Sequence, residues 1–216
     1  MLRFGTRFAG TTRVQQTPLS SVGAYGLAPF VALGGLALVG AHDEALKSWP
    51  VDALVVTEAV AIAACVNQIV KFSFGRERPI VHALASAEKL TAAQPSDNNT
   101  SFYSGHTSLA FSLAVAAGTV ATMRGYRWAP YIWVSGLVVA GTTGYLRIAG
   151  DRHYATDVLA AATVGSALGF AVPFLFIGRW EVTGQPSVRR QCLGERSYSS
   201  RGHRRRPASP QEDYRT

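Results

Sequence analysis

Five apolar segments place the strongest constraint on how this 216-residue chain can fold. Each is 16 to 21 residues long and nearly free of charge, and together they comprise residues 24–41, 51–70, 108–123, 129–146 and 158–178. A helix of about 20 apolar residues spans the hydrocarbon core of a bilayer. Nothing in the chain indicates a strand, because its short β-branched runs fit helices equally well. The sequence therefore predicts an all-α fold, a transmembrane or membrane-associated bundle of about five long apolar helices.

Two features of these segments indicate that the helices pack against one another. Asp52, Glu58 and Asn67 interrupt the second segment, and polar residues at membrane depth usually face other helices. Gly165 and Gly169 in the fifth segment are typical of helices whose backbones approach closely in a membrane. A soluble, Ala-rich bundle remains an alternative, because the mean hydropathy is only +0.12.

The net charge of +8 lies at the two ends of the chain. Residues 1–23 carry +3, residues 179–216 carry +5, and residues 24–178 are neutral overall. We therefore expect a basic N-terminal segment, a helical bundle over 24–178 and a disordered basic tail, with an anionic membrane surface as partner and no nucleic acid. The two cysteines, Cys65 and Cys192, have no metal-ligand spacing and leave the redox compartment open.

Charged residues follow the fourth segment in a pattern that suggests chemistry. Arg147 ends that segment, and His153 and Asp157 come four residues apart before the fifth. If the chain is helical here, the carboxylate lies one turn from the imidazole and can bind one ring nitrogen while leaving the other for catalysis. An arginine beside them would bind an anionic substrate. The alternative is a solvated connection with an intrahelical pair.

Alternation of the segments across the bundle predicts that one end carries the functional site. It places four charged or polar positions at that end: Lys71, His106, Arg147 and Asp157. The opposite end receives three arginines: Arg124, Arg127 and Arg179. By the positive-inside rule the arginine-rich end is cytoplasmic, so the site would face the periplasm or the cell exterior. Five crossings put the N-terminal arginines on the outer side against this rule, unless a first helix is missing or these residues lie in the interface.

Two further groups share the predicted site end. Lys71 precedes Arg78-Pro79 by six intervening residues, and Ser104-Gly105-His106 stands where a helix would begin and direct its N–H groups at a ligand. Cations, a hydroxyl, a glycine and two histidines together suit a tetrahedral oxyanion.

The long stretch 71–102 is predicted to be a loop that carries function, because structureless connections of this length are otherwise uncommon. Within it, Arg76 and Glu77 are expected to pair with each other or with solvent. His82 has no partner at helical or motif spacing and is expected to be an ordinary loop histidine.

Three motifs, Lys71-x6-Arg78-Pro79, Ser104-Gly105-His106 and Arg147-x5-His153-x3-Asp157, resemble the signature motifs of the type 2 phosphatidic acid phosphatase (PAP2) superfamily. The resemblance covers residues 24–178. Tyr103 stands where the family mostly has proline, and Leu146 stands where it often has serine. Neither position holds a group that performs the chemistry.

The resemblance implies a role for each motif residue. His153 would attack phosphorus, Asp157 would fix its tautomer, and His106 would protonate the leaving oxygen and then activate water. The phosphate oxygens would be held by five residues: Lys71, Arg78, Ser104, Gly105 and Arg147. No metal and no other cofactor is implied.

The sequence therefore predicts a metal-independent phosphatase that hydrolyses a phosphate monoester or pyrophosphate, of a lipid, through a phosphohistidine intermediate. We expect it to be a multi-pass protein of a bacterial-type inner (plasma) membrane with its active site on the outer face. Two alternatives stay open: a vanadate-dependent haloperoxidase, and a non-enzymatic membrane protein that retains an anion site. The particular substrate and the oligomeric state are not specified by the sequence.

Overall fold

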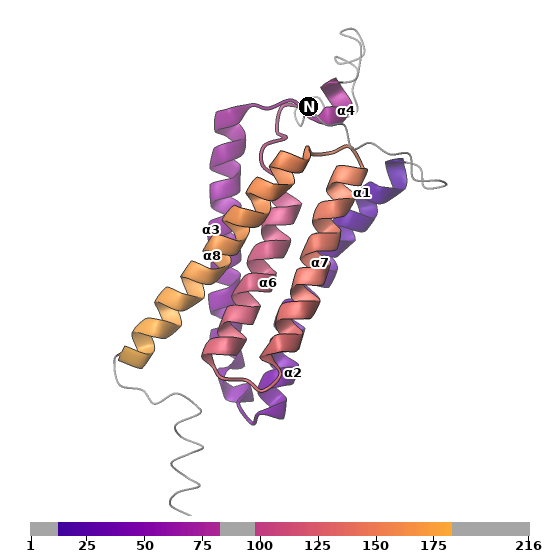
Figure 1. Ribbon diagram of the computed structural model, residues 1–216. Helices are drawn as coiled ribbons and strands as arrows, with labels where there is room; N and C mark the ends of the chain where they lie inside the picture. The colour runs from indigo at the N-terminus through magenta and orange to yellow at the C-terminus, as the bar shows by residue number, and fades with distance from the viewer. Residues whose placement is uncertain (1–12, 83–97, 183–216) are drawn as a thin grey trace, which may run out of the picture.

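Helices and their connections make up the part of the chain that the structure, a computed structural model, describes, residues 13–82 and 98–182 (Figure 1). Five helical runs are long and apolar enough to cross a membrane, by length and composition: Pro18–His42, Leu46–Phe74, Gly105–Met123, Ala129–Ala149 and Ala155–Gly178. They run alternately up and down the bundle (Figure 1). The predicted all-α fold with about five long apolar helices is thus confirmed.

The first run begins earlier than the apolar segment that predicted it. It consists of four consecutive elements: α1 (Arg13–Val22), the π-helical turns η1 (Gly23–Leu27) and η2 (Phe30–Gly34), and α2 (Gly35–His42). Part of the predicted N-terminal segment 1–23 is therefore helical, whereas residues 1–12 lie outside the described part. Polar residues such as Ser20 and Ser21 ended the apolar pattern but did not end the helix.

The second run ends at a glycine. A short 3₁₀ turn, η3 (Leu46–Ser48), leads into α3 (Trp49–Phe74), and Pro50 at the start suits a first turn, where its missing N–H costs nothing. Gly75 ends the helix with a left-handed φ of 54°, a conformation that glycine adopts without steric penalty. Lys71 consequently lies on the last helical turn, not in a loop as the sequence suggested.

The third run, α6 (Gly105–Met123), lies at the centre of the bundle and contacts α3, α7 (Ala129–Ala149) and α8 (Ala155–Val182) (Figure 1). A Cβ atom built on Gly165 of α8 would lie 2.5 Å from the carbonyl oxygen of Ser108, and one on Gly169 would lie 2.7 Å from that of Ser112. The two backbones therefore approach as closely as the glycine spacing predicted.

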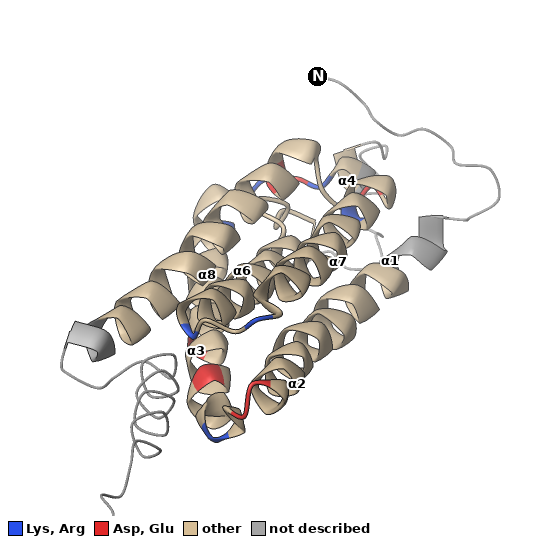
Figure 2. Cartoon of the chain, turned by 60° about the horizontal axis from the view of Figure 1, so that its bottom comes forward, with Lys and Arg blue, Asp and Glu red and all other residues tan. Residues whose placement is uncertain are grey.

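Large apolar side chains cover the outside of the bundle. Examples on α3, α7 and α8 that are at least half exposed are Leu54, Ile69, Val134, Val138, Leu159, Phe170 and Phe174. Such a surface suits lipid and would be a liability in water. Charged residues gather near the two ends of the bundle instead (Figure 2). The exposed apolar side chains therefore favour the membrane bundle over the soluble alternative.

The end of the bundle away from the predicted site is closed by a buried ion pair. Asp52, at the start of α3, is 1% exposed and accepts hydrogen bonds from Arg124 Nε at 2.8 Å and Nη2 at 2.6 Å. The hydroxyl of Tyr126 donates to the other carboxylate oxygen at 3.1 Å. This cluster ties the start of α3 to the connection between α6 and α7.

Candidate active site

The ends of four helices meet at the upper end of the bundle in Figure 1. Lys71 lies on the last turn of α3, His106 on the first turn of α6, and Arg147 on the last turn of α7. His153 precedes α8 and Asp157 lies in its first turn. The convergence that alternation predicted is therefore present, and it brings the two histidines and the cations to one place.

His153 is held by a backbone carbonyl. Its Nδ1 atom lies 2.7 Å from the carbonyl oxygen of Ser101 and 3.8 Å from Asp157 Oδ2. A carbonyl oxygen only accepts, so Nδ1 carries the hydrogen and Nε2 carries the lone pair. The sequence predicted a direct bond to Asp157 in a helix, but α8 begins only at Ala155, after the ring. The carboxylate is near, yet the carbonyl fixes the tautomer.

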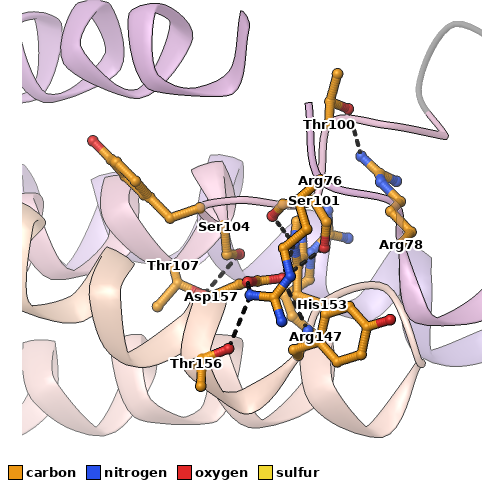
Figure 3. Close-up of polar contacts among 12 residues, drawn as sticks. Arg76, Arg78, Thr100, Ser101, Ser104, Thr107, Arg147, His153, Thr156 and Asp157 are labelled. Carbon is orange, nitrogen blue, oxygen red and sulfur yellow. Dashed lines mark hydrogen bonds and ion pairs between the residues drawn. The ribbon is translucent and has the colours of Figure 1, made fainter. Parts of the chain in front are cut away.

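Asp157 is fully buried and accepts from three donors (Figure 3). Ser101 Oγ donates to Oδ2 at 2.6 Å, the backbone N–H of Tyr154 donates to the same oxygen at 3.1 Å, and Arg76 Nη1 donates to Oδ1 at 2.6 Å. Asp157 thus supports Ser101, whose carbonyl in turn holds His153. The carboxylate therefore acts on the ring both directly, from 3.8 Å, and through this neighbour.

Arg76 was expected to pair with Glu77 or with solvent, and that expectation is wrong. Besides its bond to Asp157, Arg76 Nη1 donates to Thr156 Oγ1 at 3.1 Å, and the guanidinium lies 4.3 Å from the centre of the Tyr154 ring. Glu77 instead pairs with His82, at 3.1 Å on the surface. Arg76 lies inward because an unpaired carboxylate costs more free energy when it is fully buried, as Asp157 is, than when it is exposed.

His106 contacts two other elements through its two ring nitrogens. Arg147 Nη2 lies 2.9 Å from Nδ1, and Ser21 Oγ of α1 lies 3.2 Å from Nε2. A guanidinium only donates, so Nδ1 accepts and the ring hydrogen is on Nε2, pointing at Ser21. Arg147, which is 5% exposed, also donates from Nη1 to Ser20 Oγ at 3.1 Å.

The start of α6 lies against Lys71. A Cβ atom on Gly105 would lie 3.0 Å from Asn67 Oδ1 and 3.5 Å from Lys71 Nζ, so glycine leaves room for the ammonium group beside the helix N-terminus. Asn67 Nδ2 donates to the carbonyl of Tyr103 at 2.9 Å and fixes the connection that leads into the helix. The arrangement places N–H groups and a cation side by side, as an anion site requires.

Arg78 and Ser104 complete the set of residues that the sequence singled out. Arg78 is 6% exposed; its backbone N–H donates to Asn98 and its Nη2 to Thr100 Oγ1 at 3.5 Å (Figure 3). Ser104 is fully buried and its Oγ accepts from Thr107 Oγ1 at 3.0 Å. Its hydroxyl hydrogen is directed by this bond away from Thr107.

Burial and positive charge keep His153 neutral. Its removal from solvent lowers the pKa of the imidazole to about 4, and the nearby Arg147 and Arg78 guanidiniums add to the effect, while the Asp157 carboxylate and the hydrogen bond to the Ser101 carbonyl oppose it. Near neutral pH the ring therefore keeps the lone pair on Nε2. A neutral, oriented imidazole among cations is suited to attack an anionic centre.

Sequence reasoning missed several residues of this site. Arg76 carried a weak signal, because a charge between two motif cations is unusual. Asn67 was singled out only as a polar position that faces other helices, and Ser101, Ser20 and Ser21 carried no signal, because serine is common in polar connections. Within residues 13–82 and 98–182, no three His, Cys, Asp or Glu side chains gather as they would around a metal ion.

The described part of the chain is a helical bundle with five candidate membrane spans, and at one end it carries a cationic, two-histidine site whose charge suits an anion. The family model of the PAP2 superfamily matches residues 52–180, more than half of the chain. The chain belongs to the PAP2 superfamily, as its motifs indicated.

A search of curated proteins adds a relative with a named activity. A "Lipid A 1-phosphatase" of Porphyromonas gingivalis is 35% identical over 125 residues, which are 57% of this chain and 23% of that protein. The chain thus spans about a quarter of the length of this relative. No solved structure matches the chain.

Proposed function

We propose that this protein is a metal-independent phosphatase that hydrolyses a phosphate monoester or pyrophosphate of a lipid through a phosphohistidine intermediate. The observation that carries the proposal is the pair of histidines, His153 with its lone pair on Nε2 and His106 bound to Arg147, among three cations. One imidazole is then placed for nucleophilic attack and the other for proton transfer.

The first step forms a phosphorus–nitrogen bond. The lone pair of His153 Nε2 attacks phosphorus, and the bond from phosphorus to the leaving oxygen breaks with its electron pair on that oxygen. The ring becomes positively charged as it bonds, and the Ser101 carbonyl at Nδ1 and the Asp157 carboxylate 3.8 Å away stabilise that charge.

The phosphate oxygens are held by positive charge and by N–H and O–H donors. Lys71, Arg78 and Arg147 supply the cations, Gly105 supplies a backbone N–H at the start of α6, and Ser104 supplies its hydroxyl hydrogen. Phosphoryl transfer depends mainly on positioning and charge stabilisation. Three cations perform the neutralisation that Mg²⁺ performs in other phosphoryl-transfer enzymes.

Substrate binding prepares His106 to donate a proton. When the phosphate draws Arg147 Nη2 away from Nδ1, that nitrogen can take up a proton from water or from the bound phosphate. The resulting imidazolium gives its Nε2 proton to the leaving oxygen and returns to a neutral ring. His106 Nε2 then removes a proton from the water that attacks phosphorus, and the phosphorus–nitrogen bond breaks with its electron pair on His153 Nε2. As phosphate leaves, His106 loses its Nδ1 proton to solvent and Arg147 returns to that nitrogen.

Two observations support a lipid substrate, and a third supports its position at the outer face. The site lies at one end of a bundle whose outer surface is apolar, and the relative is named for a phosphatase of lipid A. The opposite end carries Arg124 and Arg127, which favour a cytoplasmic location for that end. The substrate phosphate would then be on a lipid of the outer leaflet.

The test is phosphate release from phosphatidate by the purified full chain in detergent, with EDTA present. We expect turnover that vanadate inhibits, that His153→Ala reduces to background and that His106→Ala reduces about 10²-fold or more. His42→Ala, at the other end of the bundle, serves as the control. Activity that is lost in EDTA and returns with Mg²⁺, or a phosphoryl label on His106, would contradict the mechanism.

A further inference from the structure

The first helical run lies outside the residues that the family model matches, 52–180, yet it reaches the catalytic histidine. Ser21 Oγ lies 3.2 Å from His106 Nε2, and Ser20 Oγ accepts from Arg147 Nη1 at 3.1 Å. The ring of Tyr25 lies edge-on to the imidazole of His106, with 4.8 Å between the ring centres. Three residues of α1 and η1 therefore surround two groups of the proposed site.

Close packing fixes this helix in place. A Cβ atom on Gly23 would lie 2.8 Å from Thr143 Oγ1 of α7, so glycine is what allows the two helices to approach here. Ser20 is fully buried, and α1 and η1 both pack on α7. Helix packing consequently fixes the backbone at Ser21 and so places its hydroxyl beside His106.

The direction of the His106 hydrogen identifies which side of the site faces the leaving group. Because Arg147 occupies Nδ1, the ring hydrogen is on Nε2 and points at Ser21. In the proposed mechanism this is the hydrogen that the leaving oxygen receives. The leaving oxygen must therefore come within hydrogen-bond reach of Nε2, on the side of α1.

We infer that the first helix forms the leaving-group side of the active site, with Ser21 as the residue that positions the proton-donating nitrogen of His106. The inference rests on the proposed phosphatase function and specifies its substrate geometry. Tyr25, 62% exposed, extends from His106 to the outer surface of the bundle, so the apolar part of a lipid leaving group lies along this helix. His153 then attacks phosphorus from the opposite side, in line with the departing oxygen.

Two substrates with different leaving groups test the inference. The leaving oxygen of octyl phosphate needs a proton as it departs, whereas that of 4-nitrophenyl phosphate departs as a stabilised anion. We expect Ser21→Ala to lower kcat for octyl phosphate about 10-fold or more, within the range of general-acid effects, and to change kcat for the aryl ester less than about 2-fold. Ser21→Thr, which keeps the hydroxyl, should restore octyl phosphate turnover.

Ser20→Ala is the matched control. Ser20 supports Arg147, which holds the phosphate common to both substrates, so this variant should weaken both reactions by the same factor. Equal loss of both reactions in Ser21→Ala, or no loss in either, would overturn the inference and leave the proposed function intact. A wild-type protein that hydrolyses neither ester would instead overturn the proposed function.

A spectroscopic measurement tests the position of Ser21 without using turnover. In ¹⁵N NMR spectra of the histidine rings, His106 should be the neutral tautomer with its hydrogen on Nε2, and Ser21→Ala should alter that N–H signal while leaving His153 unchanged. A His106 hydrogen found on Nδ1, or an Nε2 signal insensitive to Ser21→Ala, would overturn the inference.

Discussion

His153 donates from Nδ1 to the carbonyl oxygen of Ser101 over 2.7 Å, across 52 residues of chain. The bond determines which nitrogen of the proposed nucleophile carries the lone pair. Asp157 lies 3.8 Å from the ring and accepts a hydrogen bond from the Ser101 hydroxyl. It therefore fixes the position of Ser101, whose carbonyl binds the His153 ring.

The pH dependence of catalysis follows from the lowered pKa of His153. Burial and the two guanidiniums lower it to about 4, so the ring stays neutral above that pH and becomes protonated, and inactive, below it. We expect kcat/KM to fall as the pH drops through about 4, after correction for the phosphate's own ionisation near pH 6. Arg78→Gln removes one guanidinium and should move this acid limb to higher pH. An acid limb at pH 6.5 that Arg78→Gln does not move would contradict the buried, cation-lined environment.

The bond between Arg76 and Asp157 should contribute measurably to stability. Arg76→Gln removes a charge-assisted bond to a fully buried carboxylate and should lower the free energy of unfolding by about 1–3 kcal/mol, with a loss of activity. His82→Ala removes only a pair on the surface and should cost less than about 1 kcal/mol. Thermal unfolding in detergent compares the two. Equal effects would show that the inward position of Arg76 has no energetic consequence.

Close packing of α8 on α6 should be sensitive to a single methyl group. Gly165→Ala places a Cβ atom 2.5 Å from the Ser108 carbonyl oxygen, so the helices must separate, at a cost of about 1–3 kcal/mol. Since α8 carries Asp157, activity should fall as well. Gly141→Ala, which meets nothing within 4 Å, is the control and should leave both quantities unchanged. Thermal unfolding and phosphate release measure the two effects. A Gly165→Ala variant with unchanged stability and activity would contradict the close approach of α8 to α6.

The ion pair at the far end should stabilise the bundle without affecting the chemistry. Asp52→Ala leaves the Arg124 guanidinium without its buried carboxylate and should cost about 3–5 kcal/mol of unfolding free energy. The kcat of the folded fraction should stay at the wild-type value, because the site is at the other end. Asp43→Ala, which removes an exposed bond to the Arg127 backbone, should cost far less. A changed kcat in folded Asp52→Ala would reveal coupling between the ends.

Membrane orientation can be tested with single cysteines in a chain whose Cys65 and Cys192 are replaced by serine. Asn99 is exposed at the site end and Lys47 is exposed at the opposite end. We expect Asn99→Cys to react with a membrane-impermeant maleimide in spheroplasts and Lys47→Cys to react only after permeabilisation, because the arginine-rich end should be cytoplasmic. The reverse labelling would place the active site in the cytoplasm.

The sequence by itself determined the five helices and the end at which the motif residues meet. Both follow from local properties: runs of apolar residues set the helices, and alternation of direction brings Lys71, His106, Arg147 and His153 to the same end. The spacing of Gly165 and Gly169 also predicted a close approach of the fifth segment to another helix, and the structure identifies that helix as α6.

Tertiary structure alone decided which groups bind which. Ser21 and His106 are 85 residues apart, and Arg76 and Asp157 are 81 apart. A hydrogen bond weakens steeply with small changes in distance and angle, so its partner depends on helix placement to within a fraction of an ångström. Residue spacing suggested Asp157 as the partner of His153. In the structure α8 begins only after His153, and the ring binds the backbone carbonyl of Ser101 instead. No side-chain pattern in the sequence indicates such a carbonyl.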